Sequence, residues 1–317
     1  MATYRHCLPQ LDGGLFVTDG GMETTFIFHD GLQLPHFASF VMLASEEGRD
    51  RLRAYYRRYL DIARRHGAGF ILDTPTWRAN PDWGEKLHYT REALHAANVA
   101  GIDLLAELRT KHEQPDRPIV LSGAIGPRGD GYKAGNMNAA ESEDYHSIQI
   151  GSFAESQADM VTAFTLTNID EAIGVARAAA ARGMPCAISF TVETDGRLVT
   201  GRSMQDAIET TDAATDASPA YYMINCAHPS HFADALDHRS GWVKRIYGLR
   251  ANASRMSHAE LDESEELDAG DPADLGQRYR ELMQEMPQVR IVGGCCGTDH
   301  RHVAAICEAC MPAPARA

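Results

Sequence analysis

Close to the C-terminal end, residues 290–300 read RIVGGCCGTDH. A short β-branched run leads into small residues and two adjacent cysteines, Cys295 and Cys296, as at the end of a strand. Adjacent cysteines seldom bond to each other, because the small ring that they would close strains both the peptide and the disulfide torsion. We therefore expect these two cysteines to have a partner elsewhere in the chain.

Seven further runs of the same kind precede this one, and helical patterns separate them. The expected strands are 15–20, 69–74, 118–126, 158–165, 185–192, 220–229, 245–252 and 289–296. The expected helices are 46–66, 90–112, 141–157, 168–182, 203–215, 229–239, 272–286 and 299–310. Eight alternating units predict an α/β fold, a closed (β/α)8 TIM barrel. An open doubly wound sheet is the competing fold, but no GxGxxG loop follows the first strand.

The domain organisation follows from length and composition. No shift in composition divides the 317 residues, so we expect one domain over 1–317. Three connections, at 22–45, 127–140 and 253–271, are longer than a barrel requires. All three follow strands and therefore lie on the face that carries the chemistry of such barrels. They are suited to be lids or subunit contacts, so a homo-oligomer is a possible assembly.

Charge and cysteine content exclude several classes of function. The formal net charge of −14 would repel phosphate backbones and anionic membranes, so we expect no nucleic-acid or membrane partner. Neither a membrane-spanning run nor the apolar core of a signal peptide is present, which predicts a cytoplasmic protein. Seven cysteines at irregular spacing are typical of metal binding or catalysis in a reducing compartment.

The barrel predicts which cysteines meet. Cys226 ends the sixth expected strand and Cys295 and Cys296 end the eighth, so all three reach one rim. Three thiolates are the ligand set of a catalytic Zn²⁺ site that keeps a fourth position open. A rival, a structural four-thiolate site that uses Cys307 and Cys310, is disfavoured because the last expected helix carries those sulfurs away from the rim. His228 is expected to cap a helix rather than bind metal.

Four segments together resemble the homocysteine S-methyltransferase family: DGGMETT (19–25), SGAIGP (122–127), INC (224–226) and GGCCGT (293–298). The resemblance covers almost the whole chain. It implies a (β/α)8 barrel with zinc on Cys226, Cys295 and Cys296, and methyl transfer from a small sulfonium or quaternary ammonium donor to a thiol. Homocysteine would be the default acceptor, which yields methionine. Residues matching the substrate-binding positions are Asp19, Gly20, Gly21, Thr165 and Asn225.

Two departures from the family pattern leave the substrates open. Phe164 stands where the family has a glutamate for the ammonium group of homocysteine, so a thiol without an α-amino group is an alternative acceptor. Trp77 and Trp83 follow the second strand and are candidates for an aromatic box around a methylated cation. The roles of Glu23 and Asn252 stay undecided. A non-catalytic zinc or thiol sensor and a barrel kept as a scaffold are the other function classes.

Overall fold

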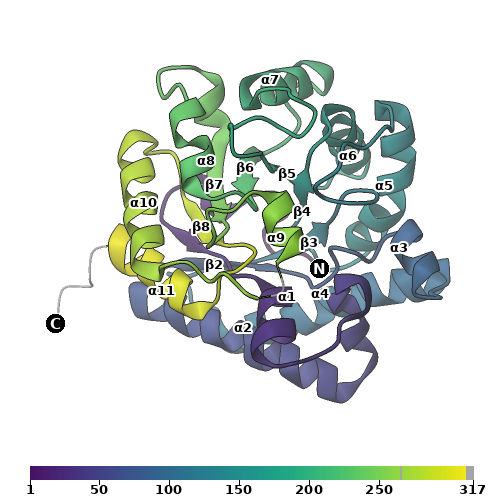
Figure 1. Ribbon diagram of the computed structural model, residues 1–317. Coiled ribbons are helices and arrows are strands. Elements are labelled where there is room, and N and C mark those ends of the chain that lie inside the picture. Colours follow the sequence, from purple (N-terminus) through teal and green to yellow (C-terminus); the bar gives the residue numbers. More distant parts are fainter. Residues whose placement is uncertain (265, 312–317) are drawn as a thin grey trace.

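Eight parallel strands close into a barrel in the computed structural model of the chain, which describes residues 1–264 and 266–311 (Figure 1). Each strand pairs with the next, and β1 pairs with β8. The strands are β1 Phe16–Val17, β2 Gly69–Asp73, β3 Ile119–Ile125, β4 Met160–Leu166, β5 Cys186–Phe190, β6 Tyr221–Asn225, β7 Ile246–Ala251 and β8 Ile291–Gly294. The predicted (β/α)8 barrel is confirmed, and the doubly wound alternative is wrong.

Helices surround the barrel and fill its connections. They are α1 Met22–Thr24, α2 Glu46–His66, α3 Pro81–Lys86, α4 Arg91–His112, α5 Ala139–Ala154, α6 Ile169–Ala181, α7 Met204–Ala214, α8 Pro229–Phe232, α9 His258–Glu263, α10 Pro272–Glu285 and α11 His300–Cys310. A π-helical turn covers Thr25–His29, and 3₁₀ turns cover Pro9–Leu11, Pro35–Phe37, Ser39–Ala44, Ala233–Ala235 and Trp242–Arg245. The short helices α1, α3 and α9 were not predicted from the sequence. Two of them, α1 and α9, lie in long connections, and α3 lies between β2 and α4.

One predicted helix is largely wrong. The expected helix at 229–239 is only one turn of α-helix, α8, followed by a 3₁₀ turn at Ala233–Ala235. Phe232 leaves the helical region at φ −126°, ψ −16°, and both Phe232 and Leu236 are buried. Burial of these two side chains outweighs the helical preference of so short a segment.

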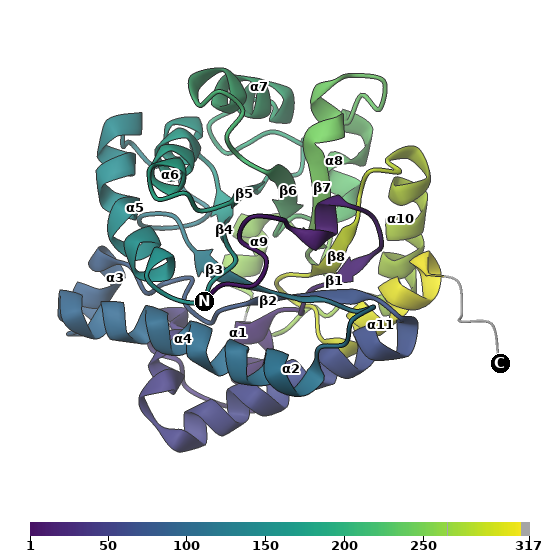
Figure 2. The same cartoon turned by 180° about the vertical axis from the view of Figure 1, so that it is seen from behind.

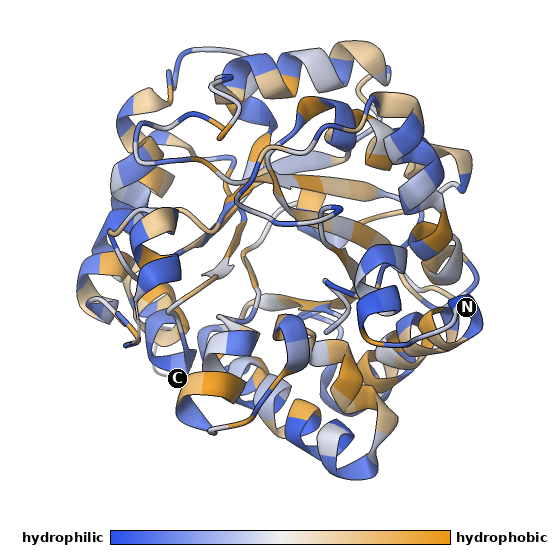
Figure 3. Cartoon of the chain, turned by 45° about the vertical axis from the view of Figure 1, so that its right-hand side comes forward, coloured by the Kyte–Doolittle hydropathy of each residue, from blue (hydrophilic) through white to orange (hydrophobic). Residues whose placement is uncertain are grey.

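Local sequence explains why the surrounding helices begin, end and dock where they do. In α2 the Ser45 side chain accepts from the N–H of Gly48 at the first turn, and Gly67 ends the helix in the left-handed conformation at φ 68°. One face carries a buried stripe that includes Leu52, Tyr55 and Tyr59. Apolar colour accordingly follows the strands and the inward faces of the helices (Figure 3).

The two ends of the barrel have different roles. In the view from behind, the N-terminal segment crosses the end at which the strands begin (Figure 2). The N–H groups of Thr3 and Tyr4 donate to Oδ1 of the buried Asp159, at 2.8 and 2.7 Å, which holds the segment there. The carboxyl ends of the strands carry the long connections, and α9 lies over that opening (Figure 1). The site is therefore expected on this second face.

Residues 265 and 312–317 lie outside the described part of the chain, although the predicted domain 1–317 and the predicted connection 253–271 include some of them. Within the described part, the helices lack the combination of length and apolar character that crossing a bilayer requires.

Candidate metal centre and substrate pocket

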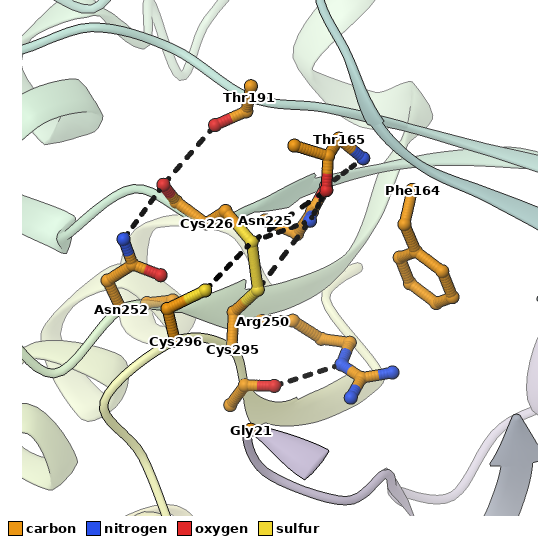
Figure 4. The surroundings of a disulfide bond; sticks show 12 residues. Gly21, Phe164, Thr165, Thr191, Asn225, Cys226, Arg250, Asn252, Cys295 and Cys296 are labelled. Carbon is orange, nitrogen blue, oxygen red and sulfur yellow. Dashed lines mark hydrogen bonds between the residues drawn. A yellow bond between two sulfur atoms is a disulfide. The ribbon is translucent and has the colours of Figure 1, made fainter. Parts of the chain in front are cut away.

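Three cysteine sulfurs converge at the carboxyl ends of two strands. Cys226 directly follows β6, while Cys295 and Cys296 follow β8, and their sulfur atoms all lie within 4.8 Å of one another (Figure 4). Among the described residues no other group of three metal-ligating side chains comes so close. Tetrahedral coordination by thiolates places the sulfurs about 3.8 Å apart. The Sγ atoms of Cys226 and Cys296, 4.0 Å apart, match that spacing, so the donor set fits a metal ion.

Two of the three cysteines are joined by a disulfide bond, which was not expected from the sequence. Cys226 and Cys295 form a disulfide bond, whereas the sequence predicted three free thiolates. Sulfurs that converge closely enough to share one metal ion are also close enough to bond to each other. Cys296 keeps a free thiol, and burial raises its pKa. The three sulfurs can hold a metal ion as thiolates only after the disulfide is reduced.

Asn225 connects the first cysteine to the end of β4. Its Oδ1 accepts from the N–H of Thr165 at 3.0 Å and from Ser189 Oγ at 2.6 Å. Its Nδ2 lies 2.9 Å from Thr165 Oγ1 and 3.2 Å from Cys226 Sγ (Figure 4). Thr165 and Cys226 both have positive φ, 61° and 53°, a conformation that costs energy for residues other than glycine. The amide of Asn225 therefore holds both turns in place.

The carbonyl oxygen of Cys226 is held from three other elements. Thr191 Oγ1 donates to it at 3.3 Å and Asn252 Nδ2 at 3.0 Å, while His258 Nε2 lies 2.6 Å away. Asn252 thus positions the backbone of Cys226, a role that the sequence analysis had left undecided. A buried carbonyl with several hydrogen bonds fixes the direction in which the Cys226 side chain points.

Two glycines permit the close packing around Cys295. Gly297 has φ 77°, which turns the chain immediately after the cysteine pair. At Gly21 an added Cβ would lie 2.6 Å from the carbonyl oxygen of Cys295, closer than carbon and oxygen approach without a bond. The loop after β1 can therefore lie against the cysteine turn only with glycine at position 21.

A pocket of about 130 Å³ opens beside the sulfurs. All the predicted substrate-binding residues line it, together with the three cysteines: Asp19, Gly20, Gly21, Trp77, Phe164, Thr165 and Asn225. Trp83 does not line it. The ring of Trp83 instead contacts two cations of this chain, with the guanidinium carbon of Arg78 and the Nζ of Lys86 each 3.8 Å from its centroid. Of the two predicted tryptophans, Trp77 alone is placed to face a ligand in this pocket.

Arg250 is a charged pocket residue that was not predicted from the sequence. Its Nη2 donates to Asp19 Oδ1 at 2.5 Å and its Nη1 donates to Asp73 Oδ2 at 2.8 Å. Tyr55 OH donates to the other oxygen of Asp19 at 2.9 Å, so this chain already uses both oxygens of that carboxylate. The sequence contains one sign of this role, because Arg250 is a charged residue inside the apolar run of β7. Asp73 at the end of β2 is a similar sign.

Two long connections meet over the cysteines. Tyr132, from the connection after β3, has its hydroxyl 3.6 Å from Cys296 Sγ. Its ring lies against the ring of His258 in α9, with centroids 4.2 Å apart. Burial raises the pKa of Tyr132 well above its ordinary value, so the phenol stays protonated. Two of the three long connections that were predicted to be lids or subunit contacts therefore touch each other, and the first of them also touches Cys296.

The remaining candidates have structural positions. His228 caps α8, where its Nδ1 accepts from the N–H of Ser230 at 3.2 Å, as predicted. Cys307 and Cys310 lie in α11 and do not join the sulfur cluster, so the rival four-thiolate site is wrong. Glu23 lines the pocket, and one of its oxygens accepts from Ser39 Oγ at 2.5 Å.

Comparison with known proteins decides the family. The sequence model of the family described as homocysteine S-methyltransferase matches residues 16–310. The chain belongs to the homocysteine S-methyltransferase family. As a member of that family it is a methyltransferase, which sets aside the sensor and scaffold alternatives. None of the curated proteins matches this sequence.

Solved structures of a homocysteine methyltransferase have the same fold as this family member. The oxidised form of the homocysteine methyltransferase MmuM from Escherichia coli matches with a TM-score of 0.75 at 20% identity, over 95% of this chain and 97% of that one. The metallated form of MmuM matches with a TM-score of 0.73 at 19% identity, over 94% and 98% of the two chains. At this identity the similarity establishes the barrel.

Proposed function

We propose that this family member is a zinc-dependent S-methyltransferase that moves a methyl group from a small sulfonium or quaternary ammonium donor to a thiol. The observation that carries the proposal is the convergence of Cys226, Cys295 and Cys296 beside an aromatic-lined pocket. A set of three thiolates suits Zn²⁺, since soft sulfur ligands favour it over Mg²⁺ or Ca²⁺. Bound there, zinc would keep the substrate thiol deprotonated at neutral pH and hold its sulfur in place.

Side chains of the protein orient the zinc ligands. Asn225 directs an N–H group at Cys226 Sγ, and the three contacts to the Cys226 carbonyl orient that ligand. Tyr132 and α9 lie beside the centre, where the hydroxyl of Tyr132 is 3.6 Å from Cys296 Sγ. Transfer of a methyl group from an onium donor releases a neutral thioether or amine, so the reaction needs no general acid in the pocket.

The charges of the pocket favour a cationic donor. Its lining contains three carboxylates, of Asp19, Glu23 and Asp73, and one guanidinium, of Arg250. Burial raises the pKa of all three carboxyls, that of Asp73 to about 7, so a surplus of negative charge surrounds the bound substrates only at a pH at which at least two of them are ionised. Trp77 and Phe164 add aromatic rings, whose faces attract methylated cations.

Homocysteine is the acceptor that the family favours, but one observation supports a second acceptor class. Arg250 and Tyr55 already occupy Asp19, and the guanidinium carbon of Arg250 lies 4.9 Å from the centroid of the Phe164 ring. The positive charge beside position 164 is therefore that of Arg250, whereas the family pattern implies the ammonium group of the substrate there. A thiol that lacks an α-amino group would not bring a second positive charge next to the guanidinium of Arg250.

A crossed assay tests both parts of the proposal. Reduced, zinc-loaded protein is incubated with S-methylmethionine, S-adenosylmethionine, glycine betaine or dimethylsulfoniopropionate, each with homocysteine or with 4-mercaptobutyrate, its analogue without the amino group. Mass spectrometry then identifies the methylated thiol. We expect a methylated thioether from at least one onium donor. The proposal fails if reduced protein that retains zinc methylates neither thiol, and the ratio of the two products decides the acceptor class.

A further inference from the structure

Arg78 holds a positive charge beside the pocket. It follows Trp77 in the connection after β2, and its guanidinium carbon lies 4.9 Å from the Trp77 ring centroid and 3.8 Å from that of Trp83. Both distances are within the range of cation–π contacts. Burial lowers the pKa of Arg78, and the charges of Glu23 and Asp130 oppose that effect. Arg78 itself does not line the pocket, but two residues whose side chains act on its guanidinium, Glu23 and Trp77, do.

One hydrogen-bond donor of Arg78 is unsatisfied among the residues that the structure describes. Within residues 1–264 and 266–311 its Nε is buried without an acceptor. By contrast, Arg109, Arg245 and Arg250 each pair with an aspartate at 2.9 Å or less. A partly buried guanidinium whose donors are unsatisfied is costly unless a ligand supplies the acceptor.

The stacking contacts limit what the acceptor can be. An arginine that rests its flat face on an indole ring leaves the N–H groups along its edge free in the plane of the guanidinium. That edge matches the two oxygens of a carboxylate, which can accept two parallel hydrogen bonds. Trp77, the neighbour in sequence, presents its own ring to the pocket. Residues 77 and 78 therefore place a surface for a cation next to a site for an anion.

We propose that Arg78 binds the carboxylate of the methyl donor and thereby selects zwitterionic onium compounds over onium compounds that lack an acid group. The proposal rests on the proposed function, because it assigns one end of the onium donor to Trp77 and the other to Arg78. The donor is favoured over the acceptor as the source of the carboxylate, since the aromatic ring adjacent to Arg78 suits a methylated cation.

Calorimetric titration of the protein tests this assignment without turnover. The probes are dimethylsulfoniopropionate and trimethylsulfonium, which carry the same kind of cation with and without a carboxylate. We expect the Arg78→Gln variant to bind dimethylsulfoniopropionate about 10- to 100-fold more weakly than the unmodified protein, the loss of hydrogen bonds to a charged group. Binding of trimethylsulfonium should not weaken, because this probe has no carboxylate to lose and the removal of a like charge cannot reduce its attraction to the pocket.

Two controls sharpen the comparison. Lys86→Gln removes another cation from the same Trp83 ring, also at 3.8 Å, and should leave the binding of both probes unchanged. Arg78→Lys retains the charge without the two-pronged edge and should recover only part of the affinity. Thermal unfolding of each variant checks that the fold is intact.

Several results would overturn the proposal. The proposal would be wrong if the unmodified protein bound dimethylsulfoniopropionate no more tightly than trimethylsulfonium. It would also be wrong if Arg78→Gln lost the same affinity for both probes. A titration with homocysteine completes the test, since a loss confined to homocysteine would move the carboxylate site to the acceptor. Failure of methyl transfer in the crossed assay would instead count against the proposed function, because these titrations require no reaction.

Discussion

The guanidinium carbon of Arg250 lies 4.9 Å from the centroid of the Phe164 ring. The two residues come from β7 and β4, and both line the pocket beside the cysteine sulfurs. Where the family pattern implies an anionic side chain facing a substrate cation, this chain has an aromatic ring facing its own cation. The pocket wall formed by these two residues is therefore electrostatically different from that pattern, while the sulfur cluster is retained.

Replacing Phe164 by glutamate should restore discrimination for the amino group. A carboxylate at position 164 would compete with Asp19 for Arg250 and leave one carboxylate available to the ammonium of homocysteine. We expect the ratio of kcat/KM for homocysteine to that for 4-mercaptobutyrate to rise by about tenfold, as for one hydrogen bond to a charged group. Phe164→Leu, which removes the ring without adding charge, is the control. An unchanged ratio in Phe164→Glu would discard the idea that this position sets the acceptor.

Zinc retention should depend on three cysteines and on their reduction. With a reductant that opens the Cys226–Cys295 bond, elemental analysis should find about one zinc per chain. Serine at 226, 295 or 296 should lower that content severely, because each change removes one of three protein ligands. The double variant Cys307→Ser/Cys310→Ser should retain zinc, since neither sulfur joins the cluster. Zinc bound by the oxidised protein, or lost from that double variant, would contradict the assignment.

Asn225→Asp should weaken zinc binding without removing a ligand. The aspartate keeps the shape of the side chain but cannot donate to Cys226 Sγ, which lies 3.2 Å from the present Nδ2. Loss of such an outer contact typically costs about 10- to 100-fold in metal affinity. Competition with a chelator measures the change. Ser189→Ala, which removes only a contact to Oδ1, serves as the comparison and should have a smaller effect. Equal affinities in Asn225→Asp and unmodified protein would refute this role of Asn225.

Arg250→Met should destabilise the fold. Asp19 and Asp73 are both buried, and the change leaves them without their common cation. Removing one partner of a buried ion pair costs about 3–5 kcal/mol. Urea denaturation gives the free energy of unfolding. Arg255→Gln breaks a pair that is largely exposed, with Asp274, and should cost less than about 1 kcal/mol. Similar losses of unfolding free energy in the two variants would show that the buried ion pair stabilises the fold no more than the exposed one.

Asp73 should make the stability of the protein fall as pH rises. Burial raises the pKa of Asp73 to about 7 in the folded state, with Arg250 opposing and Asp19 assisting the shift. The unfolded carboxyl has the model-peptide pKa of about 3.9. Between these values the folded state holds a proton that the unfolded state has lost, so raising the pH favours unfolding.

Asp73→Asn isolates this contribution. Urea denaturation at several pH values should show that the unmodified protein loses stability relative to Asp73→Asn between about pH 4 and pH 7, and that the difference is constant below that window. Parallel curves for the two proteins over the whole range would mean that Asp73 is already ionised in the folded state.

The sequence alone determined the barrel and the location of the centre. Eight apolar runs alternating with helical patterns permit few folds other than a (β/α)8 barrel, and the carboxyl ends of parallel strands share one rim. From that rule Cys226, Cys295 and Cys296 could be placed together, because Cys226 and Cys295 each directly follow a strand and Cys296 is the next residue. Asp19, Phe164, Thr165 and Asn225 could be placed at the same rim, in part through the family resemblance.

Only the tertiary structure decided which side chains meet inside the pocket. Arg250 pairs with Asp19 and Asp73 across the barrel, and Arg78 has no such partner among the described residues, although all four are ordinary charged residues in the sequence. Periodicity predicts which edge of the sheet a residue reaches. It does not predict contacts between strands far apart in the chain, because those depend on side-chain direction, burial and the competition of neighbouring charges.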